Sequence, residues 1–257
     1  MVRRGLAETR SEARHAVLAG RVTVAGRPAE KPGSLVRPDE PILTSGPPRP
    51  YASRGGEKLE AALSRFEVHV TGRRCLDAGA SSGGFTDALL AAGAAHVVAV
   101  DVGYGQLSWR IRQDGRVTVM ERTNVRALRR EALPYAPEVV TADLSFISLT
   151  KVVPALAGLA VPGADLVLLV KPQFEVERGR VGRGGVVTDP GLWRGALTSV
   201  VETCRAEGAG PLAATASPLP GPAGNVEFFL HARVGQPGRP IDLDAVVSEG
   251  SRVREAS

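Results

Sequence analysis

The sequence predicts an α/β protein, in which a small basic α+β module precedes an open, doubly wound sheet of mostly parallel strands. Two observations lead to this prediction. From Arg73 onward, short apolar runs alternate with stretches of helical spacing, a pattern typical of βαβ units. Before residue 38 the composition differs, because the whole net charge of +5 is concentrated there. A chain of 257 residues is long enough for one α/β catalytic domain and one small module.

Residues 1–43 are expected to form the basic module. Residues 1–37 contain eight Lys or Arg and three Glu, whereas residues 38–257 contain twenty-four basic and twenty-four acidic residues. Residues 9–18 have the spacing of a short amphipathic helix, and two short strands are expected to follow around an Ala-Gly-Arg-Pro turn. Concentrated positive charge favours nucleic acid as the partner over a merely solvated surface. The candidate phosphate ligands are Arg3, Arg4, Arg10, Arg14, Arg21 and Arg27.

A linker over residues 44–57, which contains the segment TSGPPRP, is expected to join this module to a catalytic domain over residues 58–235. The expected strands of the domain are 73–78, 96–101, 116–120, 138–143, 165–170 and 226–232. The expected helices are 85–93, 104–113, 149–159 and 190–206. Residues 236–257 are expected to form a loosely held tail. Ligands of such a sheet bind at the carboxyl ends of its strands.

The segment RRCLDAGASSGGFTDALL at residues 73–90 places a glycine-rich turn between a strand and a helix. Its glycines allow a tight bend and the close approach of a ligand. Asp101 ends the next strand, where a carboxylate can accept hydrogen bonds from both hydroxyls of an adenosine ribose. The glycine order differs from the G-x-G-x-x-G of dinucleotide sites, and Asp77 suits the ammonium of a methionine moiety better than a pyrophosphate. The turn therefore favours S-adenosylmethionine over NAD.

Several features bear on where the protein works. Cys75 and Cys204 lie far apart and without metal-ligand spacing, so they are expected to be structural thiols in a reducing compartment, and no metal site is expected. The N-terminal stretch lacks the apolar segment of a secretory signal. The longest apolar runs are far shorter than the ~20 residues that span a bilayer. We therefore expect a cytoplasmic protein without a membrane partner.

Lysine is rare in this chain, which contains 28 Arg but only four Lys. Arginine does not release its proton at working pH, whereas a lysine amine can act as a base. Lys171 and Asp143 lie at the ends of neighbouring predicted strands. They can form a plain ion pair there, or they can belong to a catalytic site. Lys58 and Glu227 favour the catalytic interpretation. Lys58 would favour the neutral amine of Lys171 by like charge, and the two carboxylates would orient the amines.

The sequence resembles the TlyA family of rRNA methyltransferases, in which an S4-type RNA-binding module precedes an FtsJ-like methyltransferase domain with a Rossmann-like class I sheet. The stretches that carry the resemblance are RGLAETRSEA, GRVTVAGRPAEKPG, SRGGEKL, CLDAGASSGGFTD, DVGYGQL, ERTN, ADLSFISL, VKPQFE, GGVVTD and SPLPGPAGNVEFF. The resemblance implies a catalytic set of Lys58, Asp143, Lys171 and Glu227, with Lys171 as the deprotonating amine. Together, turn and resemblance give a cofactor site of Asp77, Gly79, Ala80, Ser81, Gly83, Gly84, Phe85, Asp101, Asn124 and Asp143.

The expected activity is 2′-O-methylation of a cytidine ribose in 16S rRNA, 23S rRNA or both, with rRNA or ribosomal subunits, and not DNA, as partners. Modules of this family usually carry an Arg-Leu-Asp segment ahead of the RGLA stretch, which Met1 almost adjoins here. The module is therefore expected to be incomplete in this sequence, either because its first helix is missing or because the start site is misassigned. Two alternatives stay open. One is a non-catalytic RNA-binding or ribosome-assembly factor, which the complete catalytic set argues against. The other is a membrane-active haemolysin, a label this family has carried, which the missing signal and spanning segments argue against.

Overall fold

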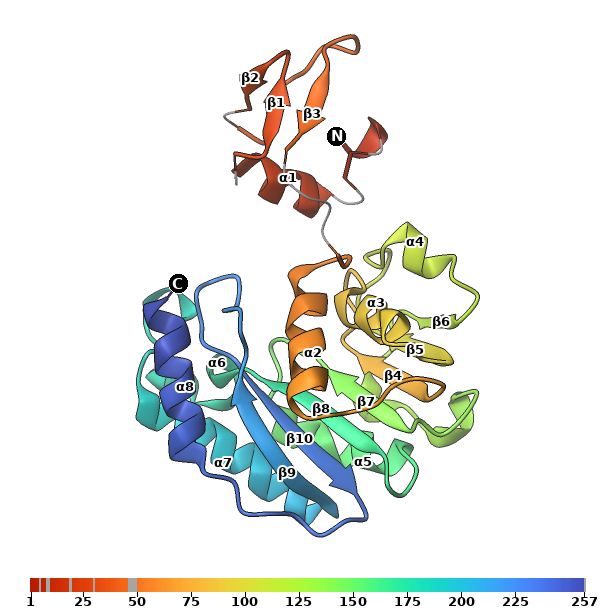
Figure 1. Cartoon of the computed structure of the whole chain (residues 1–257), viewed down its shortest axis with the longest axis vertical. Coiled ribbons are helices and arrows are strands. Elements are labelled where there is room, and N and C mark those ends of the chain that lie inside the picture. The colour runs from red at the N-terminus through yellow and green to blue at the C-terminus, as the bar shows by residue number, and fades with distance from the viewer. Residues whose placement is uncertain (5, 8–9, 19, 30, 46–49, 257) are drawn as a thin grey trace. The chain divides into compact units, whose positions relative to one another are not determined.

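The structure, a computed structural model, describes residues 1–4, 6–7, 10–18, 20–29, 31–45 and 50–256. Two compact units account for these residues (Figure 1). The first is built on residues 1–50, with 108–110 grouped with it, and the second on residues 51–107 and 111–257. The division agrees with the change of composition along the sequence, because the basic segment lies entirely within the first unit.

The N-terminal unit packs one helix on a small antiparallel sheet. Its elements are η1 (Val2–Arg4), α1 (Arg10–Leu18), β1 (Val22–Val24), β2 (Arg27–Pro28) and β3 (Ile42–Thr44), with the strands paired in the order β2-β1-β3. Ala25 and Gly26 between β1 and β2 both have positive φ, as a tight two-residue hairpin turn requires. Side chains from α1, β1 and β3 form a common core. The predicted helix and hairpin are confirmed, except that Thr9 lies outside the described residues, whereas β3 was not predicted.

The second unit is built on a seven-stranded sheet with the order β6-β5-β4-β7-β8-β10-β9. Its strands are β4 (Arg74–Ala78), β5 (His96–Val100), β6 (Val117–Met120), β7 (Val139–Ala142), β8 (Asp165–Val170), β9 (Ala209–Ala216) and β10 (Phe228–Val234). The first five strands in this order run parallel, and β10 is antiparallel to both β8 and β9. The predicted α/β fold class is confirmed.

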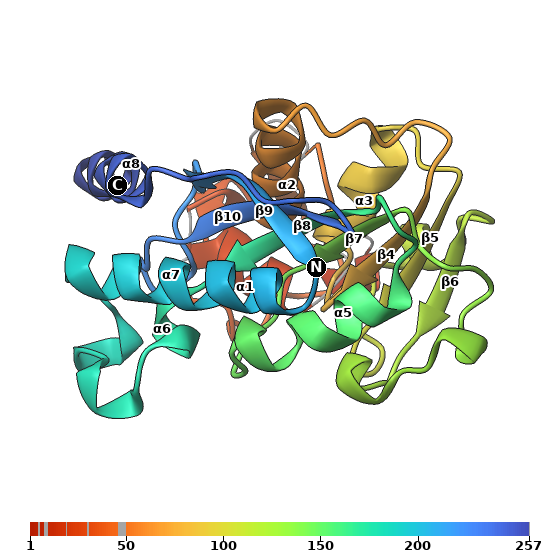
Figure 2. The same ribbon diagram turned by 90° about the horizontal axis from the view of Figure 1, so that it is seen from below.

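Helices cover both faces of this sheet, with α2 and α3 on one face and α5 and α7 on the other (Figure 2). The helices are α2 (Arg54–Arg65), α3 (Gly84–Ala91), α4 (Trp109–Arg112), α5 (Val153–Leu159), α6 (Pro172–Glu175), α7 (Pro190–Ala206) and α8 (Leu243–Glu255). Short 3-10 turns are η2 (Val125–Ala127), η3 (Arg130–Ala132), η4 (Leu149–Lys151), η5 (Arg178–Arg180) and η6 (Arg183–Gly185). Because both faces are covered, the central strands are largely apolar, which explains their apolar runs.

Alternate residues of each strand enter different cores. In β8, Leu166, Leu168 and Val170 belong to the core beneath α5 and α7, whereas Val167 and Leu169 belong to the core beneath α2 and α3. The two-residue period of a strand produces this division. Continuing the period, a side chain at position 171 projects on the face that α2 covers.

The C-terminal region corrects the predicted tail over residues 236–257. Residues Leu243–Glu255 form α8, whose N-terminus is capped by the side chain of Asp242, which accepts a hydrogen bond from Ala245 N at 3.0 Å. Val246 and Val247 are buried, and the helix contacts β9 and α7. The helix was not predicted from the sequence, because its segment is short and mostly polar and only a narrow stripe of its surface is apolar.

Three further boundaries differ from the sequence prediction. The helix α2 begins at Arg54, inside the predicted linker over residues 44–57. The helix expected over residues 104–113 is reduced to the four residues of α4. The strand β9 was missed because it contains Gly210 and Pro211, which disfavour strands. Pro211 is tolerated on this outermost strand, next to an irregularity in the register of β9 and β10.

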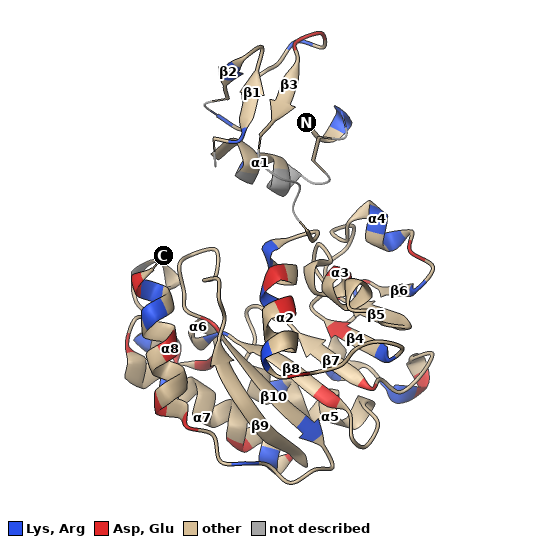
Figure 3. Ribbon diagram, viewed as in Figure 1, with Lys and Arg blue, Asp and Glu red and all other residues tan. Residues whose placement is uncertain are grey.

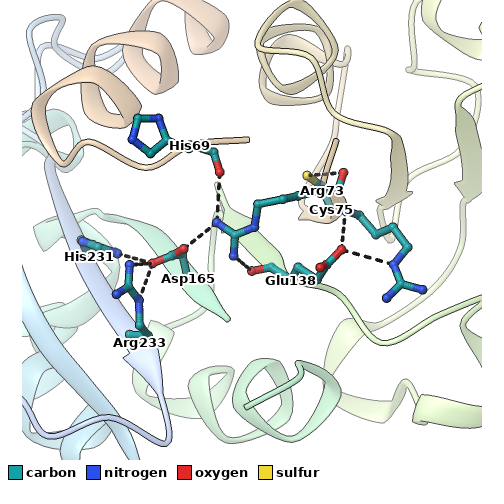
Figure 4. Close-up of polar contacts among 8 residues, drawn as sticks. His69, Arg73, Cys75, Glu138, Asp165, His231 and Arg233 are labelled. Carbon is teal, nitrogen blue, oxygen red and sulfur yellow. Dashed lines mark hydrogen bonds and ion pairs between the residues drawn. The ribbon is translucent and has the colours of Figure 1, made fainter. Parts of the chain in front are cut away.

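The amino end of β8 carries a buried polar network, which lies at the edge opposite the predicted ligand-binding edge (Figure 4). Asp165 Oδ1 is 2.8 Å from His231 Nε2 and accepts a hydrogen bond from Arg233 Nε at 2.9 Å. Arg73 Nη1 donates to Asp165 Oδ2 at 2.7 Å, and its other terminal nitrogen donates to the backbone oxygen of Glu138. The network ties β8, β10 and the segment that enters β4 together, so we assign it to stability rather than chemistry.

Candidate active site

The glycine-rich turn after β4 has little space between the strand ends. Gly79 has φ +87°, and a Cβ atom built on it would lie 2.3 Å from the backbone oxygen of Asp143. Gly83, with φ +95°, caps α3, and a Cβ atom there would lie 2.5 Å from Ile111 Cδ1. Both positions therefore require glycine, for conformation and for space. The backbone N–H groups of Gly79 and Ala80 both donate to the oxygen of Val100, which holds the turn against the end of β5.

Asp101 follows β5 and is held beside this turn. Its Oδ2 accepts a hydrogen bond from Ser81 N at 2.8 Å, and its Oδ1 accepts one from Gly103 N at 2.6 Å. A carboxylate oxygen has more than one acceptor position, so these bonds orient the group and still allow it to accept from ligand hydroxyls. Asn124 follows β6, the next strand, and its side chain caps η2 by accepting from Arg126 N at 3.1 Å. The tight turn and the acid fit a nucleoside cofactor such as S-adenosylmethionine.

Two of the predicted cofactor residues have buried side chains. Asp77 is completely buried and accepts hydrogen bonds from the hydroxyls of Thr86, at 2.7 Å, and Thr141, at 3.1 Å. Burial raises the pKa of Asp77 to about 7. The ring of Phe85 is also buried and stacks on Phe229 at 6.1 Å between ring centroids. Neither side chain is directed at solvent, so this geometry favours a supporting role beneath the turn over direct contact with a cofactor.

Lys171 and Asp143 are brought together at the carboxyl ends of the adjacent strands β8 and β7. Lys171 Nζ lies 2.5 Å from Asp143 Oδ1 and donates a hydrogen bond to Ser145 Oγ at 3.2 Å. The side chains are 11% and 27% exposed, so the pair borders the surface. Ser145 was not singled out from the sequence, although its place two residues after a strand-end acid, in ADLSF, was a usable signal.

Lys58 and Glu227 form a second pair, which is more deeply buried. Lys58 Nζ lies 2.6 Å from Glu227 Oε2, and the side chains are 7% and 2% exposed. Lys58 belongs to α2, which Ser53 caps by accepting from Gly55 N at 3.2 Å. Glu227 immediately precedes β10. An ion pair at this depth needs both partners, because either charge alone would be buried without compensation.

The strand register makes the two pairs neighbours. Phe228 of β10 pairs with Val170 of β8, so continuing this antiparallel register by one residue places Glu227 opposite Lys171. Side chains directly opposite each other on antiparallel strands point to the same face, with Cβ atoms about 5 Å apart. Glu227, with Lys58 paired to it, is therefore placed at the same end of the sheet as Lys171 and Asp143. Two amines face two carboxylates there, so Glu227 offsets the like-charge effect expected of Lys58.

Figure 3 marks the positions of Lys and Arg along the ribbon. The predicted phosphate ligands of the N-terminal unit differ in their surroundings. Arg3, Arg14 and Arg27 are exposed, and Arg21 is half-buried. Arg4 instead donates hydrogen bonds to the backbone oxygens of residues 37, 38 and 40, at 2.7, 3.0 and 2.5 Å. It therefore fixes a loop of the unit. The side chain of Arg10 lies outside the described part of the structure.

Among the described residues, no helix combines the length and the hydrophobicity of a membrane span. No group of three or more His, Cys, Asp or Glu residues in this part of the chain is arranged to hold a metal ion.

Comparison with known proteins identifies both units. The model of FtsJ-like methyltransferases matches residues 51–234, and the model of the S4 domain matches residues 1–42. The 16S/23S rRNA (cytidine-2′-O)-methyltransferase TlyA of Mycobacterium tuberculosis is 54% identical over 235 residues, which cover 91% of this chain and 87% of that protein.

Solved structures support the same assignment. A protein from Streptococcus thermophilus that is named a hemolysin is 37% identical, with a TM-score of 0.82 over 98% of this chain and 93% of that one. An S-adenosylmethionine dependent methyltransferase from Mesorhizobium loti is 15% identical, with a TM-score of 0.50 over 67% of this chain and 96% of that one, and shares the fold. This chain therefore belongs to the TlyA family of S-adenosylmethionine-dependent methyltransferases and joins an S4 domain to an FtsJ-like methyltransferase domain.

Proposed function

We propose that this methyltransferase modifies the ribose 2′-hydroxyl of a cytidine in 16S rRNA, 23S rRNA or both. The observation that supports this most directly is the lysine amine of Lys171, held by Asp143 and Ser145 at the same sheet edge as the glycine turn. The M. tuberculosis relative, at 54% identity, carries this activity in its name. A ribosomal substrate also favours the cytoplasm as its place of work.

The cofactor site of the proposal lies at the carboxyl ends of β4, β5 and β6. We assign the ribose hydroxyls to Asp101 and the close backbone approach to the turn from Gly79 to Gly84, with Asn124 after β6. S-adenosylmethionine supplies an electrophilic methyl group when it is bound. Asp143 lies between the glycine turn and Lys171, because its backbone packs against Gly79 and its carboxylate against the amine.

Lys171 is the proposed general base. Its neutral amine would accept the proton of the 2′-hydroxyl at Nζ as the ribose oxygen bonds to the methyl carbon. The bond from that carbon to the cofactor sulfur would break at the same time, leaving the demethylated cofactor, a neutral thioether, as the second product. Asp143 and Ser145 orient the amine, and the carboxylate of Asp143 stabilises the ammonium that results. The amine must lose a proton to solvent before each cycle, so activity is expected to rise with pH.

The pair of Lys58 and Glu227 forms the inner wall of the proposed site. Glu227 lies opposite Lys171 by the register of β8 and β10, and Lys58 neutralises it. We propose that this pair sets the position and the charge around the base rather than transferring a proton. The S4 unit is the proposed docking element, with the exposed residues Arg3, Arg14 and Arg27 as phosphate contacts.

The proposal is tested with labelled S-adenosylmethionine and purified small subunits, large subunits and protein-free rRNA. Label should enter at least one RNA, and the site should resist alkaline cleavage at the methylated ribose. Lys171→Ala, with an intact fold, should transfer no label. Transfer of label to a base rather than to a ribose would contradict the proposed acceptor.

The same purified protein also tests the two alternative functions, that of a non-catalytic assembly factor and that of a membrane-active haemolysin. A non-catalytic assembly factor would bind rRNA without transferring label. A lytic protein would release dye from liposomes, and Lys171→Ala would leave that release unchanged.

A further inference from the structure

The loop after β7, residues 143–149, contacts the segment of residues 171–175 after β8 at several points. Besides the contacts of Lys171 with Asp143 and Ser145, the ring of Phe146 packs on that of Phe174 at 5.2 Å between centroids. Both segments begin at a proposed catalytic residue. Their relative position therefore determines where the amine lies with respect to its carboxylate.

Glu175 closes this junction at its far end. Its Oε2 accepts a hydrogen bond from Ser148 Oγ at 2.6 Å, and its Oε1 accepts one from Leu149 N at 2.8 Å. Leu149 is buried in the core beneath α5 and α7, so Glu175 is anchored to the body of the fold. Glu175 is half-buried and ends α6, the four-residue helix that begins directly after Lys171.

The loop between these anchors has a conformation that needs support. Phe146 has φ +65° and is 92% exposed, so neither backbone preference nor burial holds it in place. Positive φ in a bulky residue persists only where the surroundings impose it. Here the loop is fixed on one side by the end of β7 and on the other by the two hydrogen bonds to Glu175.

We infer that Glu175 is a positioning residue, which holds residues 143–149 against residues 171–175 so that Asp143 and Ser145 keep the Lys171 amine in place. The polar partners recorded for Glu175 are Ser148 and Leu149, and those for Lys171 are Asp143 and Ser145, so Glu175 acts through the loop. The inference rests on the proposed role of Lys171 as base. It predicts a loss in the chemical step without a loss in cofactor binding, because the glycine turn and Asp101 belong to other strand ends.

The test compares Glu175→Ala, Glu175→Gln and the control Glu177→Ala, an exposed acid two residues further on. Melting temperatures, the Kd for S-adenosylmethionine, kcat and the KM for rRNA are measured well below the melting transition. Glu175→Ala should lower kcat by about tenfold to a hundredfold, the cost of misplacing reacting groups by about an ångström. Its cofactor Kd should stay within about twofold, as in Glu177→Ala.

Glu175→Gln should recover most of the activity, because its side-chain oxygen still accepts from Leu149 N and its amide can donate to the Ser148 hydroxyl. An unchanged kcat in Glu175→Ala, or a loss of cofactor affinity as large as the loss in kcat, would overturn the inference. So would a glutamine variant as impaired as the alanine variant.

Ser148→Ala is the second test if Glu175→Ala does not fold, because it removes one of the two hydrogen bonds to Glu175 and leaves the acid in place. Since it also removes the side-chain cap of η4, Thr150→Ala, which leaves the Glu175 contacts intact, is measured beside it and should keep its kcat. In Ser148→Ala, a lowered kcat with an unchanged cofactor Kd supports the inference, and an unchanged kcat overturns it. Wild-type transfer to rRNA in the same assay tests the proposed function separately, and its absence would overturn both.

Discussion

The Nζ atom of Lys171 lies 2.5 Å from Asp143 Oδ1, and the two residues directly follow adjacent parallel strands. Although the atoms are so close, Asp143 Oδ1 accepts no well-directed hydrogen bond from the described residues. The attraction is therefore mainly one between charges, and the directed hydrogen bond of the amine is the one to Ser145. Asp143 and Ser145, which belong to one loop, therefore hold the amine in place, and substitution of Lys171 tests what the amine does.

The substitution Lys171→Arg distinguishes two roles of Lys171, that of a general base and that of a charged partner for Asp143. Arginine keeps the positive charge but does not release a proton at working pH. We expect kcat to fall by about 100- to 10,000-fold, the usual contribution of a general base, with cofactor and rRNA binding preserved. Steady-state kinetics and calorimetry measure the two effects.

Lys151→Arg, at the exposed end of η4, is the matched control and should behave as the wild type. The pH-rate profile of the wild type should lose activity toward acid pH. If the arginine variant at position 171 retains more than about a tenth of the rate and no acid limb exists, Lys171 is not the base.

Asp101→Ala should weaken binding of S-adenosylmethionine by at least about tenfold, since hydrogen bonds to a charged group contribute about 1.5–3 kcal/mol. The substitution also removes the acceptor for the N–H groups of Ser81 and Gly103, so the turn itself becomes less ordered. Isothermal titration calorimetry is the direct measurement. Asp244→Ala, an exposed acid at the start of α8, should leave the affinity unchanged, and equal affinity in the two variants would refute the assignment.

Removal of residues 1–50 should preserve cofactor binding and abolish methylation of ribosomal RNA. The remaining unit contains the whole seven-stranded sheet and both of its cores, whereas the removed unit carries the excess positive charge. Binding of the full-length protein to rRNA should weaken steeply with added salt, because phosphate contacts release counterions. Methylation at the full-length rate by the shortened protein would show that docking lies elsewhere.

Asp165→Asn should destabilise the fold by about 3 kcal/mol at pH 7, because it leaves charged partners without their buried acid. Burial alone would raise the pKa of Asp165, but hydrogen bonds from His231, Arg73 and Arg233 outweigh it and hold the pKa well below its usual range. A lowered pKa in the folded state stabilises the protein above the unfolded value of about 3.9 and loses that effect as the pH falls.

Urea denaturation from pH 7 down to pH 3 measures this effect as the difference in unfolding free energy between wild type and variant. The difference should shrink below about pH 4. Asp244→Asn, in the exposed pair with Arg194, is the control and should cost less than about 1 kcal/mol at every pH. A difference that stays constant down to pH 3 would show that Asp165 acts through packing and not through its charge.

The sequence by itself predicted the features that depend on local pattern. A buried parallel strand is a short apolar run, and the residue that ends it lies at the ligand-binding edge, so Asp101, Asp143 and Lys171 could be placed without coordinates. The glycine turn is equally local, because the conformation at Gly79 excludes other residues. These signals were sufficient for the fold class and for placing Asp143 beside Lys171, whereas the complete set with Lys58 and Glu227 was implied by the family resemblance.

Only the tertiary structure decided which of the candidate side chains are buried and which lie near the surface. Asp77 follows the expected pattern in sequence, yet two hydroxyls from α3 and β7 enclose it. Glu175 has no distinguishing local signal, because its partners lie 26 and 27 residues away. The helix α8 and the strand β9 were missed for a related reason. The sequence of α8 has a low helix propensity and that of β9 a low strand propensity. Each is stabilised by apolar contacts with the other, and these contacts form only after the chain has folded.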